Sequence, residues 1–243
     1  MAVGGSEERG DPCLVLKGLS KNFGGLHALS NLDLIAYPGD RLAIIGPNGA
    51  GKTTLFELIT GDFPPTRGQI LLFQRDVTRW PTHRRIYLGM GRTCQITSLF
   101  PDLTVLENVV LAVQGIKRMK LTMHRFLTSY GDIYAKARGL LEQAALEDRW
   151  DTQVVNLSHG EHRQVEVVMA LASDPKLILL DEPTAGLSPA ESAMMASMLQ
   201  KLDKNITMLI IEHDMDVAFE IADRIAVLHY GELLAEGTKE EIR

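Results

Sequence analysis

A glycine-rich stretch at residues 46–54 carries the clearest chemical signal in the sequence. It reads Gly-Pro-Asn-Gly-Ala-Gly-Lys-Thr-Thr and matches the pattern G-x-x-x-x-G-K-[ST]. In this pattern, backbone N–H groups and a helix N-terminus converge on phosphates, the lysine reaches the outer phosphates, and the hydroxyl binds magnesium. The sequence therefore predicts a nucleotide site with Lys52 and Thr53 as its principal ligands, together with Gly46, Pro47, Asn48, Gly49, Ala50, Gly51 and Thr54.

Two adjacent carboxylates, Asp181 and Glu182, follow the apolar segment 177–180. Phosphoryl transfer needs a metal that neutralises developing charge and a residue that orients the attacking group. We expect Asp181 to hold magnesium through water and Glu182 to point toward an attacking water. A strand that ends in Asp-Glu is about as often a plain turn, but the phosphate loop upstream favours the functional interpretation.

The segment Leu157-Ser-His-Gly-Glu161 precedes an apolar helical stripe. Ser158 and Glu161 have the spacing of a capping box, in which each side chain bonds the other residue's backbone N–H. A capped helix N-terminus beside a glycine is also an anion site. The structural and the functional interpretations of this segment can therefore hold together.

The remaining pattern predicts the elements that position these residues. Leu55, Leu58 and Ile59 fall on one face of a helix after the glycine loop, and Gly61 is its expected C-cap. A helical pattern over 103–147 predicts a helical insertion. Apolar segments followed by helical patterns predict a parallel sheet covered on both faces, with strands at 41–45, 177–180 and 206–211. Shorter segments between turn signals predict an antiparallel patch from 13–15, 29–34 and 68–73.

Composition excludes several other classes. The net charge of −6 and the pI near 5.7 give no basic field for nucleic acid, so no nucleic-acid partner is expected. Two distant cysteines, Cys13 and Cys94, suit a reducing compartment. The N-terminus has no apolar signal segment, and the longest apolar runs have strand length. A membrane role would therefore need a separate polypeptide.

In their order along the chain, the motifs resemble those of an ABC ATPase. They comprise the phosphate loop, Gln95, the signature 157–161, the segment 179–184 and Ile211-Glu-His213-Asp. The resemblance covers about 13–243, and it implies an α/β P-loop NTPase with a RecA-like core, an antiparallel β subdomain and an inserted helical subdomain. The implied division is a tail at 1–12, a core at 13–95 and 158–243, and a helical subdomain at 96–157. Three further stretches resemble the ATP-binding subunits of branched-chain amino acid importers and, similarly, the urea-importing branch: 91–95, 99–108 and 185–189.

The resemblance also implies roles for single residues. Phe23 would stack on adenine, although packing alone would explain an aromatic there about as often. Gln95 would sense magnesium and the attacking water while coupling to the membrane subunit. His213 would contact the γ-phosphate and position Glu182, whereas a lone histidine is more often structural. Residues of the signature would close over the γ-phosphate of an opposite subunit: Ser158, Gly160 and Glu161.

Three residues depart from the pattern of the family. His159 replaces a common glycine, Glu161 replaces glutamine, and Ser188 stands where many relatives carry an aspartate that contacts the partner subunit. These departures bear on the symmetry and rate of hydrolysis, and they suggest a hypothesis that the natural partner is a non-identical subunit.

Together the motifs predict a peripheral ATPase at the cytoplasmic face of the inner membrane, using ATP and Mg²⁺. Its expected partners are a second ATP-binding subunit, identical or paralogous, permease subunits and an extracytoplasmic solute-binding protein. The expected function is to power import of branched-chain amino acids or a similar small polar solute. A urea or amide importer, a lipid or polysaccharide exporter and a soluble ABC ATPase stay open, whereas a P-loop kinase would leave 157–161 unexplained.

Overall fold

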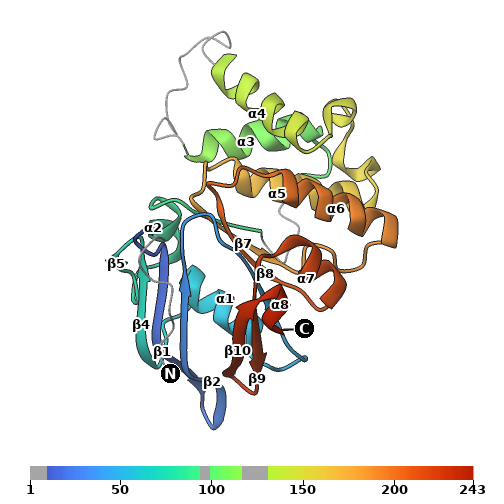
Figure 1. Ribbon diagram of the computed structural model, residues 1–243. Coiled ribbons are helices and arrows are strands. Elements are labelled where there is room, and N and C mark those ends of the chain that lie inside the picture. Colours follow the sequence, from blue (N-terminus) through green and yellow to red (C-terminus); the bar gives the residue numbers. More distant parts are fainter. Residues whose placement is uncertain (1–9, 94–98, 117–130, 243) are drawn as a thin grey trace. The chain divides into compact units, whose positions relative to one another are not determined.

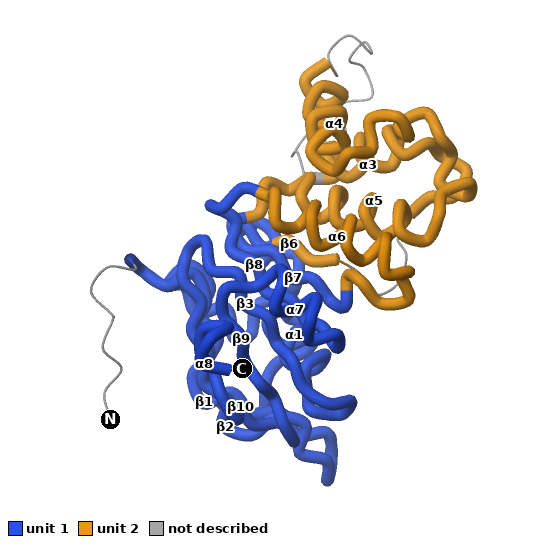
Figure 2. Tube along the Cα trace, turned by 45° about the vertical axis from the view of Figure 1, so that its right-hand side comes forward, with its two compact units in different colours: residues 1–90, 176–182, 203–243 blue, residues 91–175, 183–202 orange. Residues whose placement is uncertain are grey.

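The computed structural model describes residues 10–93, 99–116 and 131–242. The chain divides into two compact units, coloured separately in Figure 2. The first unit contains Met1–Met90, Lys176–Glu182 and Asp203–Arg243, and the second contains Gly91–Pro175 and Pro183–Leu202. The predicted tail at 1–12 lies mostly outside the described residues, and the functional division at 96–157 stays a prediction.

An antiparallel sheet of four strands forms one layer of the first unit (Figure 1). Its order is β2-β1-β4-β5, with bounds Leu26–Ala36, Leu14–Phe23, Arg67–Leu72 and Arg75–Asp76. The predicted antiparallel patch is therefore confirmed, although β1 and β2 are longer than the apolar segments suggested. Irregular register between them interrupts the alternation of buried and exposed residues, which hides part of each strand from pattern analysis.

The larger sheet has the order β10-β9-β3-β8-β7-β6. Strands β7, β8, β3 and β9 are parallel neighbours, and β10 pairs antiparallel with β9. All residues of β3, β7 and β8 are buried, as expected for strands covered on both faces. The bounds in chain order are Arg41–Ile45 (β3), Met90–Arg92 (β6), Leu177–Asp181 (β7), Thr207–Ile211 (β8), Arg224–His229 (β9) and Glu232–Thr238 (β10).

Helices of the first unit cover opposite faces of this sheet. Leu42 and Ile44 of β3 share a core cluster with α1 (Lys52–Thr60), and the alternate residues Ala43 and Ile45 pack with α7 (Met215–Ile221). Two short helices complete the unit, α2 (Thr82–Ile86) and α8 (Lys239–Ile242). The predicted parallel core is confirmed, and Gly61 is the C-cap of α1 as expected.

The second unit is mainly helical. Its helix α3 contacts α4 and α5, and α5 contacts α6. Thr104 and Glu107 form a capping box at the start of α3, with Thr104 N donating to the carboxylate at 2.7 Å and Glu107 N to the hydroxyl at 3.2 Å. The bounds are Val105–Ile116 (α3), Gly131–Gln143 (α4), Glu147–Arg149 (η2), Val154–Asn156 (η3), His159–Leu171 (α5) and Pro189–Lys201 (α6).

Arg85 of α2 caps the C-terminal end of α1. It is 1% exposed, and its Nη1 donates to Leu58 O and Ile59 O, both at 2.7 Å, while Nε donates to Trp80 O at 2.9 Å. The last carbonyls of a helix have no partner within it, so the guanidinium supplies the missing donors. A Cβ on Gly61 would lie 2.6 Å from Arg85 Nε, so the close approach needs glycine there.

Replacing Arg85 with methionine should lower the free energy of unfolding by about 3 kcal/mol, because buried carbonyls would lose charged donors. Burial lowers the pKa of Arg85 to about 10, although the negative charge of Asp62 acts to raise this pKa. The guanidinium is therefore charged at neutral pH. Urea denaturation measures the change. The control Arg84→Met alters an exposed neighbour on the same helix and should shift stability by less than about 0.5 kcal/mol. Equal effects from the two substitutions would contradict the capping role.

Candidate functional site

Three parallel strands of the first unit bring the predicted phosphate residues to one edge of the sheet. The glycine loop follows β3, Asp181 is the last residue of β7, and His213 lies two residues beyond β8. Since β7 and β3 both pair in parallel with β8, their carboxyl ends meet, which is where ligands bind in such sheets. Glu182 N donates to Ile211 O at 2.9 Å and fixes the two strand ends to each other.

The glycine loop has a backbone that other residues could not adopt easily. Gly51, at the start of α1, has φ 99°, and a Cβ there would lie 2.6 Å from Ala28 O. Gly46 has φ 152°, and its Cβ would lie 2.1 Å from Leu228 O. The pattern therefore requires glycine here because neighbouring strands approach the loop closely.

Lys52 is the first residue of α1 and is 5% exposed. Its Nζ donates to the loop carbonyls Gly46 O at 2.7 Å and Pro47 O at 3.1 Å. Burial lowers the pKa of Lys52, while the carboxylates of Glu182 and Asp181 raise it. The structure thus brings the lysine and the two carboxylates within electrostatic reach, as a phosphate site requires.

Glu182 has φ 48°, in the left-handed region that residues other than glycine seldom adopt. Such strain typically occurs at functional sites. Its Oε1 lies 2.5 Å from His213 Nε2, and both side chains are partly exposed. The carboxylate is therefore held in a fixed position by a residue from the neighbouring strand end.

These residues fit a nucleotide phosphate with Mg²⁺. The loop offers backbone N–H groups at a helix N-terminus, and Lys52 adds a positive charge. The carboxylate of Asp181 and the hydroxyl of Thr53, the second residue of α1, are the oxygen ligands that magnesium takes. Glu182 can accept a hydrogen bond from a water that attacks the outer phosphate.

Phe23 ends β1 and is 44% exposed. Its ring meets Phe63 edge to face at 5.3 Å between centroids, and Lys21 Nζ lies 4.9 Å from its centre. The packing interpretation thus accounts for the contacts of the ring with Phe63 and Lys21, although the residue stays partly exposed. Stacking on adenine stays a prediction.

The signature lies in the second unit, at the start of α5. Ser158 is the N-cap and Glu161 completes the predicted capping box, with Ser158 N donating to the carboxylate at 2.8 Å and Glu161 N to the hydroxyl at 3.2 Å. Arg149 Nε lies 2.7 Å from the other oxygen of Glu161. Burial raises the pKa of Glu161, but the bond from Ser158 and the arginine outweigh burial, so the pKa falls below its ordinary value. Gln95 lies outside the described residues.

Sequence reasoning missed two charged residues near this signature. Arg149 follows no pattern that would predict its ion pair with Glu161. Glu191 could have been found, because Ser188 and Glu191 repeat the Ser-x-x-Glu spacing and form a second capping box at the start of α6.

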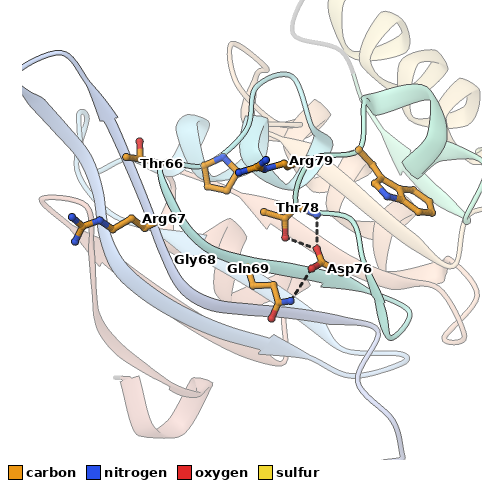
Figure 3. A pocket seen from close by; sticks show the side chains of 9 residues that line it. Thr66, Arg67, Gly68, Gln69, Asp76, Thr78 and Arg79 are labelled. Atoms are coloured by element: carbon orange, nitrogen blue, oxygen red, sulfur yellow. Dashed lines mark hydrogen bonds between the residues drawn. The ribbon is translucent and has the colours of Figure 1, made fainter.

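A separate polar pocket lies against β4 and β5 in the first unit (Figure 3). Asp76 accepts hydrogen bonds from Thr78 Oγ1 at 2.6 Å and Gln69 Nε2 at 2.8 Å, and the threonine hydroxyl makes the largest contribution to a lowered Asp76 pKa. These polar groups bond one another, and the lining at 65–69, 76 and 78–80 is distinct from the phosphate loop.

A parallel sheet with a phosphate loop after one strand and paired carboxylates after another defines a P-loop nucleoside triphosphatase. Residues 29–185 match the family model described as ABC transporter. The chain belongs to the ABC transporter family and is an ATP-binding subunit, an ATPase coupled to transport. The predicted family and fold class are confirmed.

Curated relatives agree over nearly the whole chain. The high-affinity branched-chain amino acid transport ATP-binding protein LivG of Escherichia coli (strain K12) is 37% identical over 96% of this chain and 94% of that protein. The probable branched-chain amino acid transport ATP-binding protein LivG of Archaeoglobus fulgidus is 35% identical, over 94% of this chain and 90% of that protein.

Solved structures show the same fold. The ADP conformation of MJ1267, an ATP-binding cassette of an ABC transporter, aligns with a TM-score of 0.84 at 31% identity, covering 95% of this chain and 92% of that one. A dimeric post-hydrolysis state of the cassette MJ0796 bound to ADP and Pi aligns with a TM-score of 0.77 at 27% identity, covering 93% and 98%. Of the described residues, no helix combines the length and the apolar character needed to cross a membrane.

Proposed function

We propose that this chain hydrolyses ATP to power import of branched-chain amino acids or a similar small polar solute. The single observation that carries the solute class is the 37% identity to LivG across both chains. The site described above supplies the ATPase part of the proposal, because its charged groups fit a nucleotide phosphate and an attacking water.

In this proposal, the phosphate loop and Lys52 bind the phosphates of ATP and Phe23 stacks on adenine. Thr53, Asp181 and Gln95 would hold magnesium, which would supply positive charge to neutralise the phosphates. Glu182 orients the attacking water and accepts its proton, and His213 fixes Glu182 while contacting the γ-phosphate.

The site is completed by a second subunit. Ser158, Gly160 and Glu161 of one subunit close over the γ-phosphate held by the other, so that hydrolysis requires a dimer of identical or paralogous subunits. Closure and opening of the dimer would drive permease subunits at the cytoplasmic face of the membrane, with an extracytoplasmic protein delivering the solute.

Copurification from gently solubilised native membranes in the presence of ATP tests this function. We expect the tagged chain to bring down multi-spanning permease subunits and a second ATPase, and proteoliposomes of the complex to accumulate radiolabelled leucine at least about tenfold over a no-ATP control. Uptake of urea but not leucine would show that the transported solute is urea and not a branched-chain amino acid. Recovery of the chain only with soluble partners would overturn the transport role.

A further inference from the structure

A single carboxylate joins the N-termini of α5 and α6 within the second unit. Glu191 Oε2 accepts from Ser188 N at 2.9 Å and from Ser188 Oγ at 2.7 Å, which closes the capping box of α6. Its other oxygen, Oε1, accepts from Gly160 N at 3.1 Å. Glu191 therefore caps two helices, its own and the helix that begins with the signature.

The contact with Gly160 is close. A Cβ on this glycine would lie 2.8 Å from Glu191 Oε1 and 2.9 Å from its Cγ, so the carboxylate packs directly over the glycine backbone. Ser188 makes the largest contribution to lowering the pKa of Glu191, through its hydroxyl and then its N–H, and the Gly160 N–H and His159 add to the effect. Glu191 is thus an anion at neutral pH.

Two carboxylates lie at the start of α5, Glu161 of α5 itself and Glu191 of α6, and they differ in their partners. Arg149 neutralises Glu161 through an ion pair. Glu191 is held by backbone and hydroxyl donors, so its negative charge stays at the positive end of the α5 helix. That helix end is the place where a phosphate would gain the same stabilisation.

We propose that Glu191 is an intramolecular competitor that occupies the Gly160 amide in the free subunit and must release it before the ATP phosphate of the partner subunit can bind there. The proposal rests on the proposed role of the signature. An N–H group donates fully to one strong acceptor at a time, and two anions at one helix end repel each other. Release can leave the α6 capping box in place, because Ser188 bonds Oε2 whereas Gly160 bonds Oε1.

The test measures ATP hydrolysis by the purified transporter complex as a function of MgATP concentration. Glu191→Gln should lower KM for ATP about fivefold, because a bond to a charged acceptor is roughly twice as strong as one to a neutral acceptor. Glu191→Ala, which removes the competitor altogether, should lower KM further. The matched control is Glu107→Gln, which alters the same capping-box contacts at the start of α3 and should leave KM unchanged.

A purely structural role would move the melting temperature or kcat and leave KM unchanged. Hydrogen exchange of the Gly160 amide in the isolated chain gives a second readout, and we expect faster exchange in Glu191→Ala than in the wild type. If both Glu191 variants form an active complex with an unchanged KM, the proposed competition for the Gly160 amide is overturned, whereas the proposed ATPase function stands. A complex without any ATPase activity would overturn the proposed function, and the competition with it.

Discussion

Replacing Glu182 with glutamine should reduce ATP hydrolysis by about 10²- to 10³-fold while ATP binding is retained. Glutamine keeps the size of the side chain but cannot accept a proton from water, and it replaces the carboxylate that lies 2.5 Å from His213 Nε2 with a neutral amide. The binding groups, Lys52 and the glycine loop, are unchanged. Phosphate release measures hydrolysis, and titration with a fluorescent ATP analogue measures binding.

Glu240→Gln is the matched control for this experiment. It neutralises an exposed carboxylate on α8 of the same unit and should leave the rate within about twofold of the wild type. A Glu182→Gln protein that hydrolyses ATP at the normal rate would remove Glu182 from the mechanism. Loss of binding together with hydrolysis would instead indicate that the strained backbone at φ 48° had rearranged.

Replacing Lys52 with alanine should weaken ATP binding by about 10²-fold, because charge-assisted bonds from the ammonium to phosphate would be lost. The native Lys52 residue is 5% exposed, and its ammonium donates to Gly46 O and Pro47 O of the loop, so it is already positioned for a phosphate. Without it, Asp181 and Glu182 would repel the nucleotide. Isothermal titration calorimetry gives the dissociation constant directly.

Lys204→Ala controls for a change in net charge, since this exposed lysine precedes β8 in the same unit. It should leave the dissociation constant unchanged, and both variants should melt close to the wild type. Equal affinities of Lys52→Ala and wild type for ATP would exclude the phosphate loop as the nucleotide site.

The sequence predicted those parts of the molecule that depend on local chemistry. Strands β3, β7 and β8 are fully buried, so continuous apolar runs identified them, and the glycine loop is a contiguous motif. The capping box at Ser158 was also predictable, because both its residues lie within one turn.

Contacts between distant segments were not predictable. Arg85 reaches carbonyls 26 and 27 residues away, and Glu191 reaches an amide 31 residues away, so both depend on how helices pack. The left-handed backbone of Glu182 was equally hidden, because a glutamate after a strand carries no local signal for that conformation. Irregular pairing between β1 and β2 likewise concealed the full length of both strands.

The cap that Arg85 places on α1 changes how mutational screens of this protein should be interpreted. The helix that starts at the phosphate loop ends in the guanidinium of a residue outside every nucleotide motif. Substitutions at Arg85 or Gly61 would therefore reduce transport by lowering the amount of folded protein, since a loss of a few kcal/mol can change cellular abundance several-fold. Screens that score growth alone would assign such positions to catalysis, and a parallel measurement of protein abundance separates the two causes.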